Sequence, residues 1–399
     1  MFGWEFPPFN SGGLGVACQG LSRALVSHDA QIIFVLPKKL PVSQEQIKFL
    51  FAGIERLKVA DTALSGYLGP ESYRHLRDCI PGGVYGDDLF AEVIRYAQLV
   101  PDLIAGESFE VIHALDWLSF LAGIEAKRIS GKPLIVHVHA TSFDHSGGEG
   151  ADGRIYAIEK KGFERADAIV AVSHFTKRMI VERYGISPDK IHVVHNGVEG
   201  SLGEAQDSKK PILAFKRPGE KLILFLGRLT LQKGPDYFLT AAQKMLIHYP
   251  RARFVIAGSG DMEWSLMRQA IALGIANRVH FTGFVRGEEL SALYRGADLY
   301  VMPSVSEPFG IAALEALRYN TPVIVSKQSG VSEVLTHALR VDFWDTDELA
   351  NKMIAVLQNP ALASQLRREG RYQALAQTWE KAASLCLALY RTLTKGNVY

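Results

Sequence analysis

The stretch KLILFLG at residues 221–227 decides how the fold is organised, because an alternation of strands and helices pauses before it and restarts there. It is an almost continuous apolar run that ends in glycine, as expected of a strand buried on both faces of a parallel sheet. Further apolar runs follow, each with a helical segment behind it, at 253–258, 279–283, 298–303 and 322–326. The second half of the chain therefore predicts one doubly wound sheet.

The first half of the chain shows the same alternation. Its apolar runs predict strands at 31–37, 111–115, 134–139, 168–173 and 191–195, and helices are predicted at 14–28, 117–130, 154–166 and 174–185. Between the halves, residues 197–211 are polar and lack periodicity, which indicates a linker. We therefore expect an α/β protein with two doubly wound, Rossmann-like parallel-sheet domains that face a central cleft, since such sheets bind ligands at the carboxyl ends of their strands.

We place the domains at residues 1–197 and 198–376. In residues 377–399, apolar side chains from Trp379 to Leu393 recur at helical spacing, so a final helix is expected to cross back to the first domain. One feature of the start is unusual. Only MFGWEF precedes the glycines at 12–15, so the first strand is either very short or begins upstream of Met1 in the natural protein.

Composition narrows the class of protein. The 399 residues are 48% apolar and 22% charged with a net charge of +2, which gives no general attraction to nucleic acid. No apolar run reaches the roughly 18 residues of a membrane span, and the N-terminus lacks a signal peptide. The cysteines, Cys18, Cys79 and Cys386, lie far apart without metal-ligand spacing. We expect a cytoplasmic protein with reduced thiols.

Residues 38–59 mix Lys and Arg with Ile, Phe and Leu. Such a segment can lie on a membrane surface, so peripheral membrane contact is one interpretation. Packing of the segment on the protein's own core is the interpretation that we favour.

The segment SEPFGIAALEA at 306–316 carries two glutamates eight positions apart. Pro308 suits the first turn of a helix, which would place Glu307 at the start of that helix and Glu315 about two turns along it. Two acids at that separation cannot easily share one proton. We expect them to serve two parts of one long ligand.

Two glycine-containing loops and one basic loop follow predicted strands. In GRLTLQKG at 227–234, Arg228 and Lys233 suit a diphosphate, although a solvated basic loop is the simpler interpretation of this stretch alone. In NSGGLGVACQG at 10–20, the glycines permit close approach of a phosphate or sugar, or only a tight turn. AGSGD at 257–261 favours a turn.

The segment HVHATSFDHSGGEGADG at 137–153 ends a strand and opens into a polar loop. Alternation places His137 and His139 on one face, with His139 at the end of the strand, where catalytic groups of such folds lie. We expect His137 to be buried and hydrogen-bonded. A metal site is the rival interpretation, but no carboxylate or third histidine has convincing ligand spacing.

Taken together, these stretches resemble the retaining GT-B glycosyltransferases of family GT4, the glycosyl transferases group 1, over nearly the whole chain. The most specific element is the E-x7-E pattern from Glu307 to Glu315, and AVSHFTKRMI at 171–180, HNGV at 195–198 and GGLG at 12–15 stand in the family's order. The chain is also similar to glycogen and starch synthases, but Asn10 and Ser11 stand where those enzymes usually carry Lys-Thr.

The resemblance implies that residues 198–376 bind a nucleotide-diphosphate sugar and that residues 1–197 form the acceptor side. Arg228 and Lys233 would neutralise the diphosphate, and Glu315 would accept hydrogen bonds from the ribose. His139 and Glu307 would act at the transferred sugar. The remaining implied contacts are backbone groups at the diphosphate, namely Phe309, Gly310, Ile311, Gly12 and Gly13, and two weaker candidates in the cleft, Asp144 and Ser173.

The implied reaction moves a sugar, glucose being one candidate, to a hydroxyl acceptor with retained configuration and without a metal or cofactor. A narrower interpretation is an α-glucan synthase. Two interpretations come from other classes. A glycoside hydrolase would use two carboxylates but leaves Arg228 and Lys233 unexplained. A catalytically silent nucleotide-sugar-binding protein would bind the donor without turnover.

Overall fold

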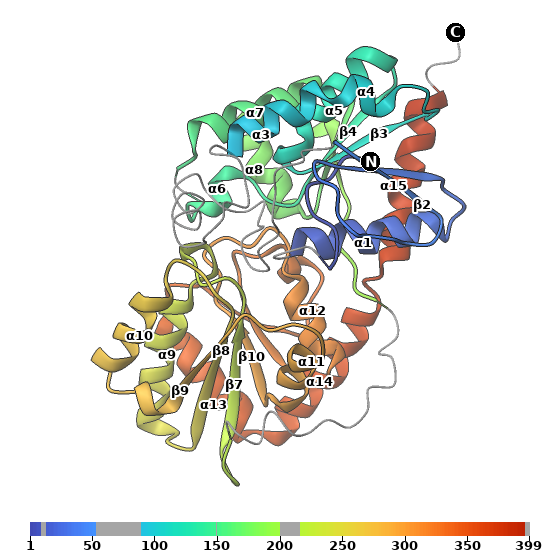
Figure 1. Ribbon diagram of the computed structural model, residues 1–399. Coiled ribbons are helices and arrows are strands. Elements are labelled where there is room, and N and C mark those ends of the chain that lie inside the picture. Colours follow the sequence, from blue (N-terminus) through green and yellow to red (C-terminus); the bar gives the residue numbers. More distant parts are fainter. Residues whose placement is uncertain (9–12, 53–88, 149, 200–215, 396–399) are drawn as a thin grey trace. The chain divides into compact units, whose positions relative to one another are not determined.

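The computed structural model describes residues 1–8, 13–52, 89–148, 150–199 and 216–395, and it divides into two compact units (Figure 1). Unit 1 comprises Met1–His145, Gly150–Gly197 and Thr378–Tyr399, and unit 2 comprises Ser146–Glu149 and Val198–Gln377. Each unit contains parallel β-structure and helices.

Unit 1 is built on parallel strands that the apolar runs predicted, together with one that they did not. The strands are β1 (Ile32–Leu36), β2 (Ile47–Phe51), β3 (Ile112–Leu115), β4 (Leu134–Val138), β5 (Ala168–Ala171) and β6 (Ile191–Val193). β3 to β6 pair in sequence order, and β1 pairs with β2. β2 lies inside the segment 38–59, so its residues 47–51 form a strand beside β1; residues 53–59 of that segment lie outside the described residues.

Phe2 occupies the place in the sheet where the first strand was expected, although it forms only isolated bridges there. Phe2 forms parallel bridges with both Val35 and Ala114, which places it between β1 and β3. Its amide donates to the carbonyl oxygen of His113 at 2.8 Å, and the amide of Gly3 donates to that of Val35 at 3.1 Å. A Cβ at Gly3 would lie 2.7 Å from the Phe34 ring, so glycine permits this close approach.

The helices of unit 1 include all the predicted segments, within two residues at each end, and also helices at 89–98, 100–104 and 142–145 that were not predicted. They are α1 (Gly13–Val26), α3 (Leu89–Gln98), α4 (Val100–Ile104), α5 (Trp117–Ser130), α6 (Ser142–His145), α7 (Gly153–Arg165), α8 (His174–Tyr184) and α15 (Trp379–Lys395), with a 3₁₀ turn η1 (Pro188–Lys190). α5 ends at Gly131, whose φ of 67° is a left-handed helix cap. Side chains such as Val136, Ile169, Phe120 and Phe163 form a buried core between helices and sheet.

The C-terminal helix α15 packs on α1 within unit 1 (Figure 1). The Trp379 ring lies against Gly20 so closely that a Cβ there would come within 2.3 Å of it. Ala382, Ala383, Cys386 and Leu389, which belong to the apolar stripe, are buried. Cys18 and Cys386 are buried free thiols, and Cys79 lies outside the described residues.

Unit 2 has one parallel sheet in the order β12-β11-β10-β7-β8-β9. Its strands are β7 (Lys221–Leu226), β8 (Ala252–Ala257), β9 (Val279–Gly283), β10 (Leu299–Met302), β11 (Val323–Ser326) and β12 (Leu339–Val341). From β7 the chain builds outward to β9, then returns to add β10 on the other side of β7. The strand order therefore reverses between β7 and β10, and this switch point is where open α/β sheets bind ligands.

Helices flank the sheet of unit 2. They are α9 (Pro235–His248), α10 (Glu263–Ala272), α11 (Gly287–Gly296), α12 (Ile311–Arg318), α13 (Thr346–Gln358) and α14 (Pro360–Leu375), with 3₁₀ turns η3 (Leu231–Lys233), η4 (Ala276–Arg278) and η5 (Gly330–Glu333). α9 packs on α13, and α12 packs on α14 (Figure 1). Across the described parts of both units, no helix combines the length and apolar character needed to cross a bilayer.

One predicted boundary is wrong. The helix of SEPFGIAALEA begins at Ile311 rather than near Pro308. Glu307 is still extended, forming a parallel bridge with Ser329, and Gly310 then turns the chain with a φ of 109°. Glu315 consequently lies about one turn, not two, beyond the start of the helix.

Candidate functional site

The loops that follow β7 and β10 are held together at the switch point of unit 2. The amide of Val305 donates to the carbonyl oxygen of Gln232 at 2.9 Å. Gly234 has a φ of 64°, and a Cβ there would lie 2.2 Å from the carbonyl oxygen of Pro303. The last glycine of GRLTLQKG therefore lets the two loops meet.

The basic loop is also supported from its other side by AGSGD. The amide of Leu229 donates to the carbonyl oxygen of Ser259 at 3.0 Å. A Cβ at Gly258 would lie 1.9 Å from the oxygen of Gly227, and one at Gly260 would lie 2.4 Å from that of Leu229. These glycines make a close-packed turn, in agreement with the interpretation that we favoured.

Glu307 and Lys233, which come from these two loops, form an ion pair. The Lys233 Nζ donates to Glu307 Oε2 at 2.7 Å, and the Ser304 Oγ donates to the same oxygen at 3.0 Å. The carboxylate is buried, and its backbone amide donates to the carbonyl oxygen of Gln328 at 2.9 Å. The structure thus brings together a cation predicted for the diphosphate and the acid predicted for the sugar.

Arg228, the other predicted cation, lies on the same loop. Its Nη2 donates to Oε1 of the buried Gln232 at 2.9 Å. Gln232 therefore contacts both loops, through its side chain to Arg228 and through its carbonyl oxygen to Val305. The sequence did not single out Gln232.

The amino end of α12 lies four residues after Glu307 in the chain. Its N-cap residue is Gly310, no side chain caps it, and its first turn contains no acidic residue. Phe309 and Gly310 are buried, and Val331 donates its amide to the carbonyl oxygen of Phe309 at 2.6 Å. An uncapped helix start of this kind presents backbone N–H groups and a positive dipole end, both of which favour an anion.

Glu315 has separate surroundings on α12. Its Oε2 accepts a hydrogen bond from the Tyr294 hydroxyl at 2.9 Å, and burial raises the pKa of this carboxyl. The Tyr294 ring stacks on that of Tyr319 with centroids 5.5 Å apart. Tyr294 therefore orients the carboxylate that was predicted to bind the ribose. Nothing in the local sequence around Tyr294 indicated this role.

In unit 1, three buried imidazoles stack on one another: His113 lies within β3, His137 within β4, and His139 directly after β4. The ring centroids of His137 and His139 are 4.4 Å apart, and those of His113 and His137 are 5.2 Å apart. His113 Nε2 and His137 Nδ1 form a hydrogen bond of 3.1 Å, so His137 is buried and hydrogen-bonded as predicted. Burial lowers the pKa of His113 and of His139 to about 3, so both rings are neutral at neutral pH.

Asp116 is a site residue that the sequence analysis missed. It follows β3 with φ 63° and ψ 166°, a conformation that is strained for a residue other than glycine. Its Oδ1 accepts from the amides of His139 at 3.1 Å and Ala140 at 3.4 Å, and burial raises its pKa to about 7. Its position directly after the predicted strand 111–115 was the available signal.

The weaker candidates have local partners. Asp144 Oδ2 accepts from the amide of Thr141 at 2.7 Å and from its hydroxyl at 2.8 Å. Ser173 caps α8 by accepting from the amide of Thr176 at 3.0 Å. Gly13 is the exposed first residue of α1, and Gly12 lies outside the described residues.

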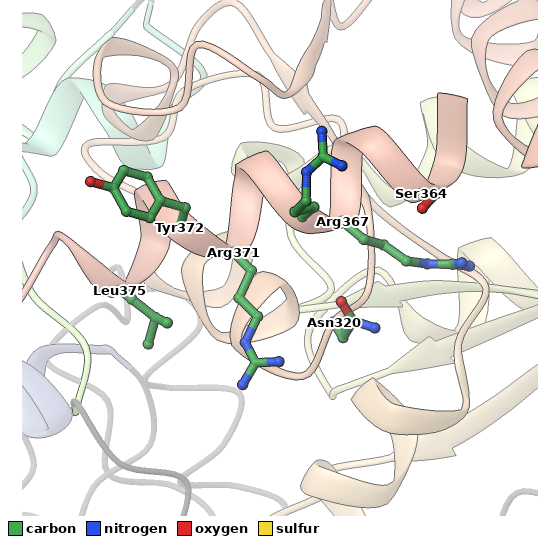
Figure 2. A pocket seen from close by; sticks show the side chains of 7 residues that line it. Asn320, Ser364, Arg367, Arg371, Tyr372 and Leu375 are labelled. Atoms are coloured by element: carbon green, nitrogen blue, oxygen red, sulfur yellow. The ribbon is translucent and has the colours of Figure 1, made fainter. Parts of the chain in front are cut away.

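No group of three or more His, Cys, Asp or Glu side chains within the described ranges is arranged to hold a metal ion. Unit 2 does have a surface hollow of about 500 Å³ on α14, lined by Asn320, Ser364, Arg367, Arg368, Arg371, Tyr372 and Leu375 (Figure 2). Asn320 follows α12 and precedes β11, so this hollow lies near the amino ends of the strands. Ligands of such sheets bind at the opposite edge, and we do not assign the site there.

Two family models match the chain. The model for glycosyl transferases group 1 matches residues 206–373, and that for glycosyltransferase family 4 matches residues 11–201.

Among curated relatives, an uncharacterised glycosyltransferase of Methanocaldococcus jannaschii is 32% identical over 356 residues, which is 84% of this chain and 82% of the relative. A glycogen synthase of Mycobacterium tuberculosis is 27% identical, covering 99% of this chain and 95% of the relative.

Solved structures share the fold. A sucrose-phosphate synthase from Thermosynechococcus elongatus gives a TM-score of 0.75 at 21% identity, covering 97% of this chain and 94% of that one. HepE of Anabaena, solved in complex with UDP-glucose, gives 0.71 at 18% identity, covering 97% and 98%. At these identities the likeness establishes the fold alone.

The raised pKa of Asp116 predicts a pH-dependent contribution to stability. The carboxyl is harder to ionise when folded, so its contribution is fully present below its ordinary pKa of 3.8 and is lost as the pH rises through about 7. Asp116→Asn, which stays neutral, should therefore gain stability relative to the wild type between pH 4 and 7. Denaturant unfolding across this range would measure the difference, with the exposed Asp102→Asn as control. A difference that does not change with pH would contradict the expectation.

Proposed function

The chain belongs to glycosyltransferase family 4, and from this premise we propose that it is a retaining enzyme that moves a sugar from a nucleoside-diphosphate sugar to an acceptor hydroxyl. The observation that carries this proposal is the arrangement at the switch point of unit 2. There Lys233 pairs with Glu307 at 2.7 Å, and the uncapped start of α12 follows four residues later in the chain. Cation, acid and helix start are the parts that a diphosphate linked to a sugar requires.

We assign the diphosphate to Arg228, Lys233 and the amides at Phe309, Gly310 and Ile311. A guanidinium can grip a phosphate with two hydrogen bonds, an ammonium supplies a point charge, and a helix start adds oriented N–H groups. Glu315, about one turn further along α12, is assigned to the ribose hydroxyls. Tyr294 already donates to Glu315, so one carboxylate oxygen is oriented before the nucleotide binds.

The same groups account for catalysis. As the sugar–phosphate bond breaks, negative charge grows on the diphosphate and positive charge grows on the sugar. Lys233 and Arg228 stabilise the first and Glu307 the second, and fixed charges of this kind lower the barrier because they need no reorganisation. These side chains supply the positive charge themselves, so we propose metal-independent transfer without a cofactor.

His139 is the unit 1 residue that we assign to the transferred sugar. It is neutral because burial lowers its pKa to about 3, so its ring offers one donor and one acceptor nitrogen to sugar hydroxyls. Asp116 holds the backbone of this segment in place, because its carboxyl oxygen accepts hydrogen bonds from the backbone amides of His139 and Ala140. Retention of configuration is carried over from the family and forms part of the proposal.

Glucose from UDP-glucose is the first donor to test. Support comes from HepE, whose structure contains UDP-glucose. A narrower proposal, an α-glucan synthase, is supported by the glycogen synthase that matches almost the whole chain. Asn10 and Ser11, in place of the Lys-Thr usual in such synthases, weigh against it. A silent nucleotide-sugar-binding protein would bind the donor and give no product.

The direct test is a donor-hydrolysis screen with UDP-, ADP- and GDP-sugars, followed by acceptor trials with the best donor. We expect release of the nucleoside diphosphate with at least one donor, at a rate unchanged by a chelator, because Arg228 and Lys233 replace a metal. Loss of activity that magnesium or manganese restores would overturn metal independence. Saturable binding without release from any donor, even with a wide panel of acceptors, would favour the silent binding protein.

The two glutamates should have separable effects. Glu315 holds the ribose in both ground and transition states, so Glu315→Gln should mainly raise the donor KM, by roughly ten- to a hundredfold for a charged hydrogen bond of about 1.5–3 kcal/mol. Glu307 matters more as charge develops, so Glu307→Gln should mainly lower kcat. Initial rates at varied donor concentration would separate the two.

Tyr294→Phe is the matched control for Glu315, because it removes only the hydroxyl that orients the carboxylate. It should raise KM in the same direction but by less, about two- to tenfold for one ordinary hydrogen bond. Melting curves would confirm that each variant is folded. Equal kcat losses at unchanged KM in folded Glu307→Gln and Glu315→Gln would refute the division of roles.

A further inference from the structure

The stacked histidines of unit 1 continue beyond β3 to the C-terminal helix. The Tyr390 hydroxyl of α15 lies 2.5 Å from Nδ1 of His113, and the two rings meet edge to face with centroids 5.7 Å apart. Tyr390 lies eleven positions after Trp379, about three helical turns, and so belongs to the same side of α15. One line of contacts therefore runs from Tyr390 through His113 and His137 to His139.

We infer that Tyr390, His113 and His137 form a buried positioning row that fixes the imidazole of His139, so that the C-terminal helix contributes to the active site. The role assigned to His139 rests on the proposed function, but the row itself does not. Its members act through one another, and none of them is assigned a contact with substrate.

Strand geometry puts the three imidazoles on one side of the sheet. His137 pairs with Leu115 across β3 and β4, and His113 lies two residues before Leu115. His139 lies two residues after His137, so the period of two gives all three side chains the same direction. The planes of neighbouring rings differ by 22° and 20°, so each ring restrains the next.

The protons of the row follow a consistent order. The burial that makes His113 and His139 neutral also lowers the pKa of His137, so each ring has one donor and one acceptor nitrogen. If Tyr390 donates to Nδ1 of His113, then Nε2 of His113 donates to Nδ1 of His137, and the proton of His137 is on Nε2. In the reverse order, Nδ1 of His113 would carry a proton and could not accept the hydrogen bond of the Tyr390 hydroxyl. The hydrogen bonds of the described residues include no other acceptor for that hydroxyl proton.

The buried row lowers the stability of the fold more than a purely apolar core of the same volume would. The Nε2 atoms of His137 and His139 are both buried without a hydrogen-bond partner among the described residues. A buried polar atom left unsatisfied loses the hydrogen bonds that water would give it, whereas apolar rings of similar size would fill the same volume without that loss. A buried polar group left unsatisfied in a folded protein calls for an explanation, and a role at a catalytic site is one of those known. The row supplies such a role, because it ends at His139.

Tyr390→Phe tests the row, because it removes one hydroxyl and preserves the ring. Thr392→Ala is the matched control, since it removes a hydroxyl of the same helix whose hydrogen bond among the described residues goes to the carbonyl oxygen of Ala388. The readout is the histidine side-chain ¹⁵N spectrum of the full-length protein, with signals assigned by single His→Gln substitutions. This measurement needs no substrate and distinguishes Nδ1–H from Nε2–H tautomers.

In the wild type and in Thr392→Ala we expect His113 and His137 to be Nε2–H tautomers. In Tyr390→Phe, the His113 and His137 signals should change toward a mixture of tautomers, and the His139 signals should shift with them. A His139 spectrum that is unchanged in folded Tyr390→Phe would overturn the proposal, whatever the enzyme's substrate.

Kinetics test the consequence for catalysis once a donor is found. Tyr390→Phe should lower kcat about two- to tenfold with an unchanged donor KM, since one ordinary hydrogen bond of about 0.5–1.5 kcal/mol is lost from the positioning of His139. Thr392→Ala should match the wild type. If kcat is unchanged although the His139 signals move, the row does not position a group that matters for transfer. If no donor is hydrolysed by the wild type, the proposed function fails, and the spectra still decide the row.

Discussion

The ion pair between Lys233 and Glu307 is the interaction on which the rest of the site in unit 2 depends. It joins the loop after β7 to the loop after β10, across the point where the strand order reverses. Glu307 is buried and Lys233 is partly buried, so breaking the pair would leave a poorly solvated carboxylate without its partner, which costs more than the pair contributes. The ion pair also accounts for the surrounding glycines. Gly234, Gly258 and Gly260 allow neighbouring backbones to approach closely, and this close packing holds both loops in place.

The stacked histidines and Asp116 of unit 1 are buried polar groups that tend toward their uncharged forms, in contrast to the ion pair of unit 2. His113, His137 and His139 lose their charge because burial lowers their pKa values, and Asp116 tends toward its protonated form because burial raises its own. Neutral imidazoles can accept and donate without the desolvation cost of a charge. In the proposed reaction, the charges in unit 2 would serve the diphosphate, which gains negative charge. The uncharged groups beside His139 would serve a sugar, which is recognised through its hydroxyls.

The sequence predicted most strands and helices because buried parallel strands are continuous apolar runs between amphipathic helices. Prediction from the sequence was wrong or incomplete where contacts between distant residues, rather than the local pattern, determine the structure. β12 was missed because it has three residues and only Val341 is buried in it. The start of α12 was misplaced because Pro308 is a good first-turn residue, whereas Gly310 and the bridge from Glu307 to Ser329 delay the helix. The roles of Tyr294 and Tyr390 could not be predicted, since their partners are distant in the chain; Tyr390 and His113 are 277 residues apart. For Asp116 the only signal was its position directly after the predicted strand 111–115.

The most direct test of the donor site is equilibrium binding of free nucleoside diphosphates, measured by titration calorimetry in the presence of a chelator. UDP, ADP and GDP would be titrated into the wild type and into Lys233→Met, which keeps the length of the side chain and removes its charge. The account predicts that at least one diphosphate binds the wild type, and binds Lys233→Met roughly ten- to a hundredfold more weakly, as expected for one charged hydrogen bond of about 1.5–3 kcal/mol. Equal affinity for both proteins, or no binding of any of the three diphosphates to the wild type, would contradict it.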